Sequence, residues 1–200
     1  MEIWIATSNK GKVKEYELLL KELSPVELHT QDEISGFSAR PETGKTFLEN
    51  ARVKSRTLRS VKDKFWVFGE DSGLEVEGLG GLPGIHSARY AGPKASDSEN
   101  VAKLLKMMTI RPMPNRKARF VCSLVIYTPD GEDWCFETAM PGEIAKAPRG
   151  QMGFGYDSIF IPDNETQTLA ELGPGFKTTK SHRALAFHEF LSRYKTLKTL

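Results

Sequence analysis

The sequence has very little cysteine and no long apolar run, and both absences narrow what the chain can be. Only two of its 200 residues are cysteines, Cys122 and Cys135. Both lie in segments patterned as strands, which is not the disulfide framework of a small secreted domain. No apolar run approaches the roughly 20 residues that a bilayer-spanning helix needs, and the first residues lack the pattern of a signal peptide. We therefore predict a cytoplasmic protein with no membrane partner.

An excess of one charge sign is absent as well. Lys and Arg number 28 and Asp and Glu number 26, which gives a formal net charge of +2. The field of the whole molecule would therefore steer nucleic acids only weakly, and we expect no nucleic-acid partner. Hydrophobic residues make up 39% of the chain, an ordinary globular balance for a length that can bury a real core. The positive charge of any anion-binding site must therefore come from residues grouped at that site.

Several common catalytic motifs are missing. Residues 44–46 (Gly-Lys-Thr) resemble the end of a phosphate-binding P-loop, but Ala39 stands where its first glycine is required. Residues 78–84 lack the dinucleotide fingerprint because Pro83 stands at the third glycine position. No Cys/His cluster has zinc spacing, and there is no G-x-S-x-G elbow. These absences argue against the corresponding enzyme classes.

Hydrophobic spacing predicts an α/β fold, with strands and helices in one unit of residues 1–200, and it allows an arrangement of two lobes around a cleft. A capping box at Ser96 and Glu99 starts one helix, which ends before the breakers Pro112 and Pro114. The expected strands are 2–7, 66–69, 118–126, 134–140 and 158–161. The expected helices are 12–23, 46–60 and 96–108, with two more from about 168 and 181. Residues 73–93 are expected to form an ordered loop.

The first candidate site follows the first predicted strand, at residues 7–12 (TSNKGK). Backbone N–H groups at a helix start, the positive end of the helix dipole and Lys12 would together favour a phosphate. A well-capped helix with solvated lysines explains the same pattern equally well.

Three acidic residues form the second candidate site: Glu42, Glu70 and Asp71. Carboxylate oxygens are what Mg²⁺ takes, with waters and substrate phosphates completing its octahedron. Adjacent residues in a strand face opposite sides, so Glu70 and Asp71 need not both bind a metal ion. Read alone, the pattern fits solvated acids at a strand end better.

Two further segments carry aromatic and basic side chains. In residues 153–157 (GFGYD), two glycines let the backbone approach a ligand, and Phe154 could stack on a base. A tight turn with core aromatics is an equally good interpretation. Near the start of the last helix, Lys177 and residues 181–183 (SHR) place cationic groups at its positive end.

Together these segments resemble the inosine triphosphate pyrophosphatase family, the non-standard purine nucleoside triphosphate pyrophosphatases. The resemblance covers nearly the whole chain and is carried by TSNKGK (7–12), ETG (42–44), FLENA (47–51) with Lys54, DSGL (71–74), PG (83–84), SARY (87–90), GFGYD (153–157) and SHR (181–183). Glu70 departs from the Asp that is frequent in the family, so whether one or two acids hold the metal stays open.

The resemblance implies a two-lobed α/β fold with a long curved mixed sheet flanked by helices, an active-site cleft between the lobes, and a homodimer. It implies cleavage of ITP, dITP or XTP between the α and β phosphates. Glu42 and Asp71 would hold Mg²⁺, and Asp71 would also accept the proton of the attacking water. The residues implied to bind the nucleoside triphosphate are Thr7, Ser8, Asn9, Lys10, Gly11, Lys12, Lys54, Ser72, Phe154, Gly155, Tyr156, Asp157, Lys177, His182 and Arg183.

Two other functions remain open from the sequence. One is a related pyrophosphatase of the Maf-like kind, acting on pyrimidine or modified nucleotides. The other is a nucleotide sensor or RNA-binding module without catalysis, against which the acids argue, because a binder of polyanions gains nothing from carboxylates unless a metal ion intervenes.

Overall fold

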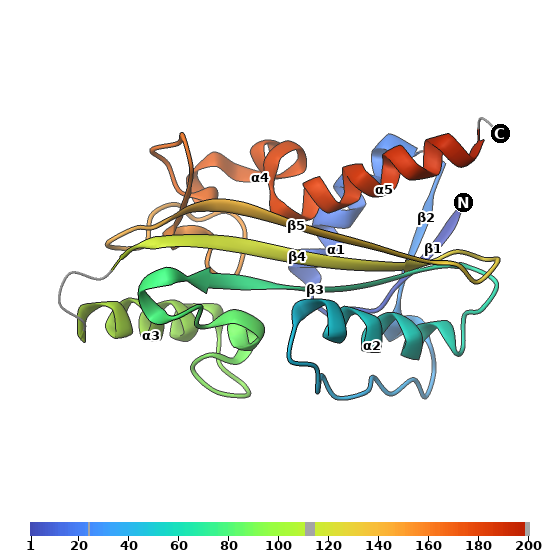
Figure 1. Cartoon of the computed structure of the whole chain (residues 1–200), viewed down its shortest axis with the longest axis horizontal. Helices are drawn as coiled ribbons and strands as arrows, with labels where there is room; N and C mark the ends of the chain where they lie inside the picture. Colours follow the sequence, from blue (N-terminus) through green and yellow to red (C-terminus); the bar gives the residue numbers. More distant parts are fainter. Residues whose placement is uncertain (24, 111–114, 199–200) are drawn as a thin grey trace. The chain divides into compact units, whose positions relative to one another are not determined.

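A computed structural model describes residues 1–23, 25–110 and 115–198, and Figure 1 shows its elements in chain order. The predicted breakers Pro112 and Pro114 lie outside the described residues. Within these residues the strands form one open, mixed, six-stranded sheet in the order β2-β1-β3-β4-β5-β6. The strands are β1 (Glu2–Ile5), β2 (Glu27–Thr30), β3 (Trp66–Val76), β4 (Lys117–Tyr127), β5 (Asp133–Ile144) and β6 (Phe160–Pro162). The α-helices are α1 (Lys10–Leu19), α2 (Phe47–Arg59), α3 (Asp97–Ile110), α4 (Leu169–Lys180) and α5 (His182–Lys198).

The sheet is mixed because its two ends pair differently. β1 runs parallel to both neighbours, with Ile3 opposite Leu28 of β2 and Trp66 of β3. β5 and β6 are antiparallel, with Glu143 opposite Ile161. The predicted α/β class is therefore confirmed, whereas the cleft between two lobes stays a prediction.

The chain divides into two compact units. Unit 1 consists of Met1–Asp71, Cys122–Thr138 and the chain from Arg183, and unit 2 consists of Ser72–Val121 and Ala139–His182. The long strands β3, β4 and β5 each contribute residues to both units.

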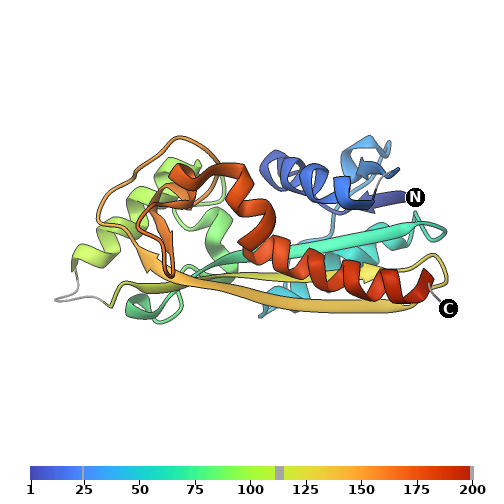
Figure 2. The same cartoon turned by 90° about the horizontal axis from the view of Figure 1, so that it is seen from above.

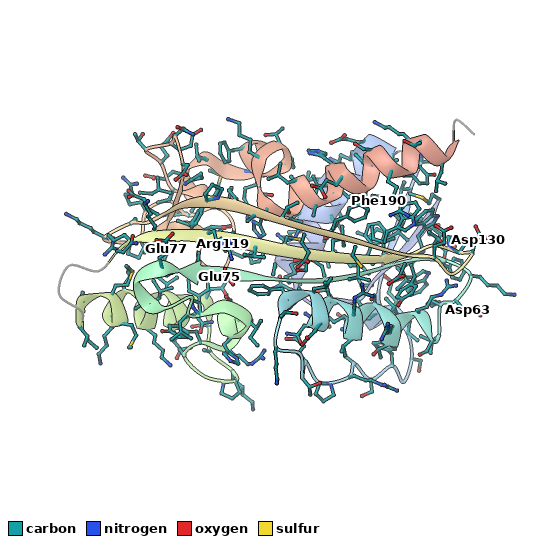
Figure 3. All side chains as sticks on the ribbon, viewed as in Figure 1. Asp63, Glu75, Glu77, Arg119, Asp130 and Phe190 are labelled. Carbon is teal, nitrogen blue, oxygen red and sulfur yellow. The ribbon has the colours of Figure 1, made fainter. Side chains whose placement is uncertain are left out.

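In unit 1, helices cover both faces of the strands. α1 and α5 lie on one face and α2 lies on the other (Figure 1), and α5 runs over β4 and β5 when seen from above (Figure 2). Phe190 of α5 points into the core between helix and sheet (Figure 3). The buried residues of this core include Ile3, Ile5, Tyr16, Phe68, Leu124, Ile126, Trp134, Phe136 and Phe187. Because side chains alternate along a strand, Trp4 and Val67 face the other way and pack with Leu58 of α2.

Unit 2 has its own core, between α3 on one face of its strands and α4 on the other (Figure 1). Its buried residues include Leu74, Val76, Val101, Leu104, Met108, Phe120, Tyr156, Ile159, Phe160 and Leu169. A capping box starts each of these helices, one between Ser96 and Glu99 as predicted and the other between Thr168 and Glu171.

Several predicted boundaries were wrong. β2 was not predicted at all, because its short exposed segment offers no clear alternation. The first helix ends at Leu19 and continues as a 3-10 turn, and 3-10 turns also occupy parts of residues 77–89. β6 begins at Phe160 and not at residue 158, because Asp157–Ile159 forms another such turn. In the described chain, no helix combines the length and apolar character needed to cross a bilayer.

α2 sits directly on β3 because Gly69 has no side chain. A Cβ added there would lie 2.5 Å from the carbonyl oxygen of Ala51 and 2.5 Å from the amide nitrogen of Ser55. Both atoms belong to the helix backbone, so neither can move without the helix moving. This close approach places one face of α2 against the middle of β3.

We expect Gly69→Ala to push α2 away from the sheet and to lower the free energy of unfolding by about 1–3 kcal/mol, the usual cost of overpacking a core. Chemical denaturation of the purified variant and of the wild-type protein measures this change in the free energy of unfolding. Gly175→Ala is the matched control, because its added methyl group would meet no atom within 4 Å. Equal stability of the two variants would contradict the close approach.

Candidate active site

Glu70 and Asp71 lie side by side in the middle of β3, and both are buried. The prediction that the strand ends at these acids was wrong, because β3 continues to Val76. A buried carboxylate is costly unless it is paired, and here each acid has cationic partners, so the strand need not end to solvate them. The two side chains face opposite sides of the sheet, as alternation requires.

Asp71 faces α2 and forms an ion pair with a lysine. Lys54 Nζ lies 2.8 Å from Asp71 Oδ1 and 2.7 Å from Glu42 Oε1, so one ammonium group joins both carboxylates. Asn50 Nδ2 donates to Asp71 Oδ2 at 3.2 Å, and Asn50 Oδ1 accepts from Gly44 N at 2.9 Å. Burial alone would lower the pKa of Lys54, but Asp71 and Glu42 outweigh it and raise that pKa. Lys54 therefore remains a cation.

Glu70 faces the opposite side and forms a second charge network. Arg183 donates from Nε to Glu70 Oε2 at 2.8 Å and from Nη2 to Oε1 at 3.0 Å, and its Nη1 donates to Glu15. Lys12 Nζ lies 3.3 Å from Glu70 Oε1. Burial would lower the pKa of Arg183, but Glu70 and Glu15 raise it well above its ordinary value. Two carboxylates and two cations thus neutralise one another, with the Arg183 side chain only 2% exposed.

The same charges act on Tyr16, which is fully buried beside this network. Burial and the Glu70 carboxylate raise the pKa of its hydroxyl well above the usual value, so Tyr16 stays neutral. Its ring lies 6.0 Å from the Arg183 guanidinium carbon, within reach of a cation–π interaction.

The turn at residues 7–12 is a well-formed helix start. Asn9 Oδ1 accepts from Gly11 N at 2.9 Å and Lys12 N at 3.1 Å, which caps α1. Thr7 Oγ1 accepts from Asn9 N, and Ser8 Oγ donates to Asp32 at 2.7 Å. The side chains of this turn therefore fix its backbone, while Lys10 is exposed at the first helical position. A phosphate role for this turn stays a prediction.

Glu42 and Asp71 are the acids predicted to hold a metal ion. Their oxygens lie within 2.8 Å of the same Lys54 nitrogen, so they form one centre of negative charge. Two carboxylates are a fitting donor set for Mg²⁺, which keeps several waters and uses one or two protein carboxylates with substrate phosphates. No group of three or more His, Cys, Asp or Glu side chains is placed to hold a metal in the described residues. Both Glu70 oxygens bond to Arg183, which argues against Glu70 as a ligand.

Unit 2 carries the other predicted binding loop, at residues 153–157. Asp157 Oδ2 accepts hydrogen bonds from Phe154 N at 2.9 Å and from Lys177 Nζ at 2.6 Å. Lys177 Nζ also lies over the Phe154 ring, 4.8 Å from the ring centroid. Gly153 has φ of 83°, and a Cβ there would lie 2.1 Å from Asp157 Oδ2. A pocket of about 500 Å³ opens beside Phe154, lined also by Val101 and Leu105 of α3.

Of the remaining predicted residues, His182 is buried at the start of α5 and stacks on Phe120, with ring centroids 4.8 Å apart and planes 7° apart. Ser72 is half-buried and directly follows Asp71 in β3. Tyr156 is buried in the core of unit 2.

Sequence reasoning missed Asn50, Glu15 and Phe120. Asn50 had a detectable signal, because it is a polar residue beside the apolar stripe of a helix, where it must find a buried partner. Glu15 and Phe120 had none, because their partners Arg183 and His182 are distant in sequence.

The fold and this geometry define an α/β protein whose sheet carries two buried, separately neutralised carboxylates. The Ham1 family model matches residues 3–193, and the chain belongs to the Ham1 family. A protein named dITP/XTP pyrophosphatase from Bdellovibrio bacteriovorus is 62% identical over 197 residues, which cover 98% of this chain and 99% of that protein. One of the same name from Geobacillus kaustophilus is 44% identical over 185 residues, or 92% of this chain and 90% of that protein.

Solved structures of Ham1 proteins are also similar to this chain. The HAM1 protein from Coxiella burnetii has a TM-score of 0.86 and 34% identity, covering 98% of this chain and 99% of that one. The Ham1 protein of Staphylococcus aureus has a TM-score of 0.83 and 36% identity, with the same coverage.

Removing the Glu70 carboxylate should destabilise the protein strongly. In Glu70→Ala the buried Arg183 loses its two hydrogen bonds to Glu70 and keeps the one to Glu15, and breaking a buried pair in this way costs about 3–5 kcal/mol. Denaturant unfolding followed by circular dichroism measures the loss. Glu75→Ala is the control, because its ion pair with Arg119 (Figure 3) involves an arginine side chain that is 60% exposed, and we expect a loss of at most about 1 kcal/mol. Equal losses would contradict the network at Glu70.

Proposed function

We propose that this protein hydrolyses non-standard purine nucleoside triphosphates to a nucleoside monophosphate and pyrophosphate. The observation that carries the proposal is the buried Asp71 carboxylate, paired with Lys54 and joined through it to Glu42. The near full-length similarity of this chain to proteins named dITP/XTP pyrophosphatase supports the substrate class. A carboxylate held in a fixed position can receive the proton of a water molecule, and the lysine beside it can offset the negative charge of a phosphate.

Glu42 and Asp71 are proposed to hold Mg²⁺, which would neutralise phosphate charge and polarise the attacked phosphorus. Lys54 already bridges these carboxylates, so it marks where positive charge is stable. When a triphosphate enters, the ammonium group can turn from the acids to phosphate oxygens at little cost in charge balance. Ser72, the next residue of β3, is proposed to donate its hydroxyl to the nucleoside triphosphate.

Asp71 Oδ atoms are proposed to take the proton of the attacking water. Asn50 holds one oxygen and Lys54 the other, which fixes the carboxylate plane. A carboxylate already held in one orientation loses little further orientational entropy when the water arrives. Lys12 and the backbone at the start of α1 are proposed to stabilise the pyrophosphate leaving group, since helix N-termini favour anions.

The base is proposed to bind through the loop at residues 153–157 with Lys177, His182 and Arg183. Phe154 offers a face for stacking, which does not select among bases. Selection would come from polar groups that pair with a 6-oxo purine and are left unpaired by adenine. Two further parts of the proposal, a homodimer and a cytoplasmic location, are supported by the family resemblance and by composition alone.

The product identifies the reaction. With ITP and Mg²⁺ we expect equal amounts of IMP and pyrophosphate, separated by anion-exchange chromatography, and no orthophosphate. Chelation of Mg²⁺ by EDTA should abolish turnover, and added Mg²⁺ should restore it. Orthophosphate as the first product, or faster hydrolysis of dTTP or UTP than of ITP, would contradict the proposal.

Asp71→Asn should keep the fold and lose turnover by about 10²–10⁴-fold, the usual contribution of a general base. The fold should survive because Lys54 retains Glu42 as a partner at 2.7 Å. Steady-state kinetics with ITP and a thermal melt measure the two effects. Asp130→Asn is the control, since Asp130 is exposed on the turn between β4 and β5 (Figure 3). Wild-type turnover in Asp71→Asn would remove Asp71 as the base.

A further inference from the structure

The loop at residues 153–157, here called the base loop, forms hydrogen bonds with two residues that have no assigned role, Asp97 and Ser87. Both belong to unit 2, as does the loop. Asp97 is the first residue of α3, and Ser87 lies in the 3-10 turn Gly84–Arg89. Ser87 also begins the SARY segment, whose presence the proposed chemistry does not explain.

Asp97 binds the backbone of the loop. Its Oδ2 accepts a hydrogen bond from Gly155 N at 2.6 Å. A charged acceptor makes such a bond shorter and stronger than a neutral one. Packing holds Asp97 in place, since it is the first residue of α3 and that helix is anchored in the core of unit 2 by the buried Val101 and Leu104.

Ser87 is fixed to β3 and also holds the loop. Leu74 N donates to Ser87 Oγ at 2.9 Å, and Ser87 Oγ donates to Gly84 O at 2.6 Å. The Tyr156 hydroxyl then donates to the backbone oxygen of Ser87 at 2.8 Å. Burial raises the pKa of Tyr156 well above its usual value, so the hydroxyl stays protonated and remains a donor.

The loop needs such support because of its own backbone. Gly153 and Gly155 have φ of 83° and 61°, and because glycine adopts positive and negative φ about equally well, these two residues do not by themselves hold the chain in this conformation. Phe154 lies between them, so the position of its ring depends on contacts from outside the pair of glycines. The Asp157 side chain fixes one end of the loop through Phe154 N, and the other contacts come at Gly155 and Tyr156.

We infer that Asp97 and Ser87 are positioning residues for the base loop: Asp97 fixes Gly155 and Ser87 fixes Tyr156, so that Phe154 is held ready for the base of the nucleotide. Neither side chain needs to touch the substrate. The inference rests on the proposed function for its kinetic test, and a second readout on the backbone amide of Gly155 is independent of any activity.

The first test removes the Asp97 carboxylate. In Asp97→Ala we expect amide hydrogen exchange at Gly155, followed by NMR, to be faster by about tenfold or more, since a hydrogen bond to a charged group is worth at least that. KM for ITP should rise about tenfold while kcat changes less than about twofold, because binding and not chemistry is affected. Asp97→Asn keeps an acceptor oxygen and should stay within about threefold of wild type in both measurements.

Glu99→Ala is the matched control, because it breaks the cap of the same helix without touching the loop. It should lower the melting temperature and leave Gly155 exchange and KM unchanged. If Glu99→Ala reproduced the effects of Asp97→Ala, or if Asp97→Ala left Gly155 exchange at the wild-type rate, the positioning role of Asp97 would be refuted. An absence of ITP turnover in the wild-type protein would instead refute the proposed function and leave the exchange test valid.

The second test removes one oxygen atom. Tyr156→Phe keeps the buried ring and loses the bond to Ser87, so KM for ITP should rise about three- to tenfold with kcat retained, in keeping with one neutral hydrogen bond. Tyr127→Phe is the control, since the Tyr127 hydroxyl pairs with Arg56 in unit 1. Equal KM values for Tyr156→Phe and wild type would overturn the part assigned to Ser87.

Discussion

The structure depends on the separation of two adjacent carboxylates by the alternation of a β-strand. Glu70 and Asp71 are neighbours in sequence, yet Glu70 meets Arg183 and Lys12 while Asp71 meets Lys54. Like charges on one side of the strand would repel in a medium of low polarity, and one of them would bind a proton. With the sheet between them, each carboxylate has its own cationic partner.

The two sides of β3 thereby acquire different properties. On the Glu70 side the Arg183 guanidinium is held by two carboxylates in fixed geometry, while Lys12 makes a longer contact of 3.3 Å with Glu70. On the Asp71 side the acids share one flexible lysine, a partner that can exchange its contacts. The second kind of arrangement fits the proposed binding and release of a nucleoside triphosphate.

The sequence predicted the α/β class, most helices and the capping residues, because these follow from local spacing and hydrogen bonding. Ser96, the predicted cap of α3, accepts a hydrogen bond from the amide of Glu99. It also predicted that Glu70 and Asp71 would diverge, since alternation is local. It did not predict the length of β3, because polar residues in mid-strand are tolerated only when distant partners neutralise them.

The pairing of particular side chains could not be read from the sequence. Arg183 and Glu70 are 113 residues apart, and no local pattern links them. No local pattern links Phe120 and His182 either, although their rings stack in the structure. Resemblance to a family predicts which residues lie near the substrate, but the residues that hold them in place are visible only in three dimensions.

The alternation in β3 also limits how the chain can diverge. Loss of a single amino acid between Trp66 and Glu70 would carry both acids to the wrong sides of the sheet, away from every cation described above. Insertions and deletions in descendants of this gene should therefore accumulate at the loops, while the spacing from Trp66 to Asp71 stays constant even where its side chains change.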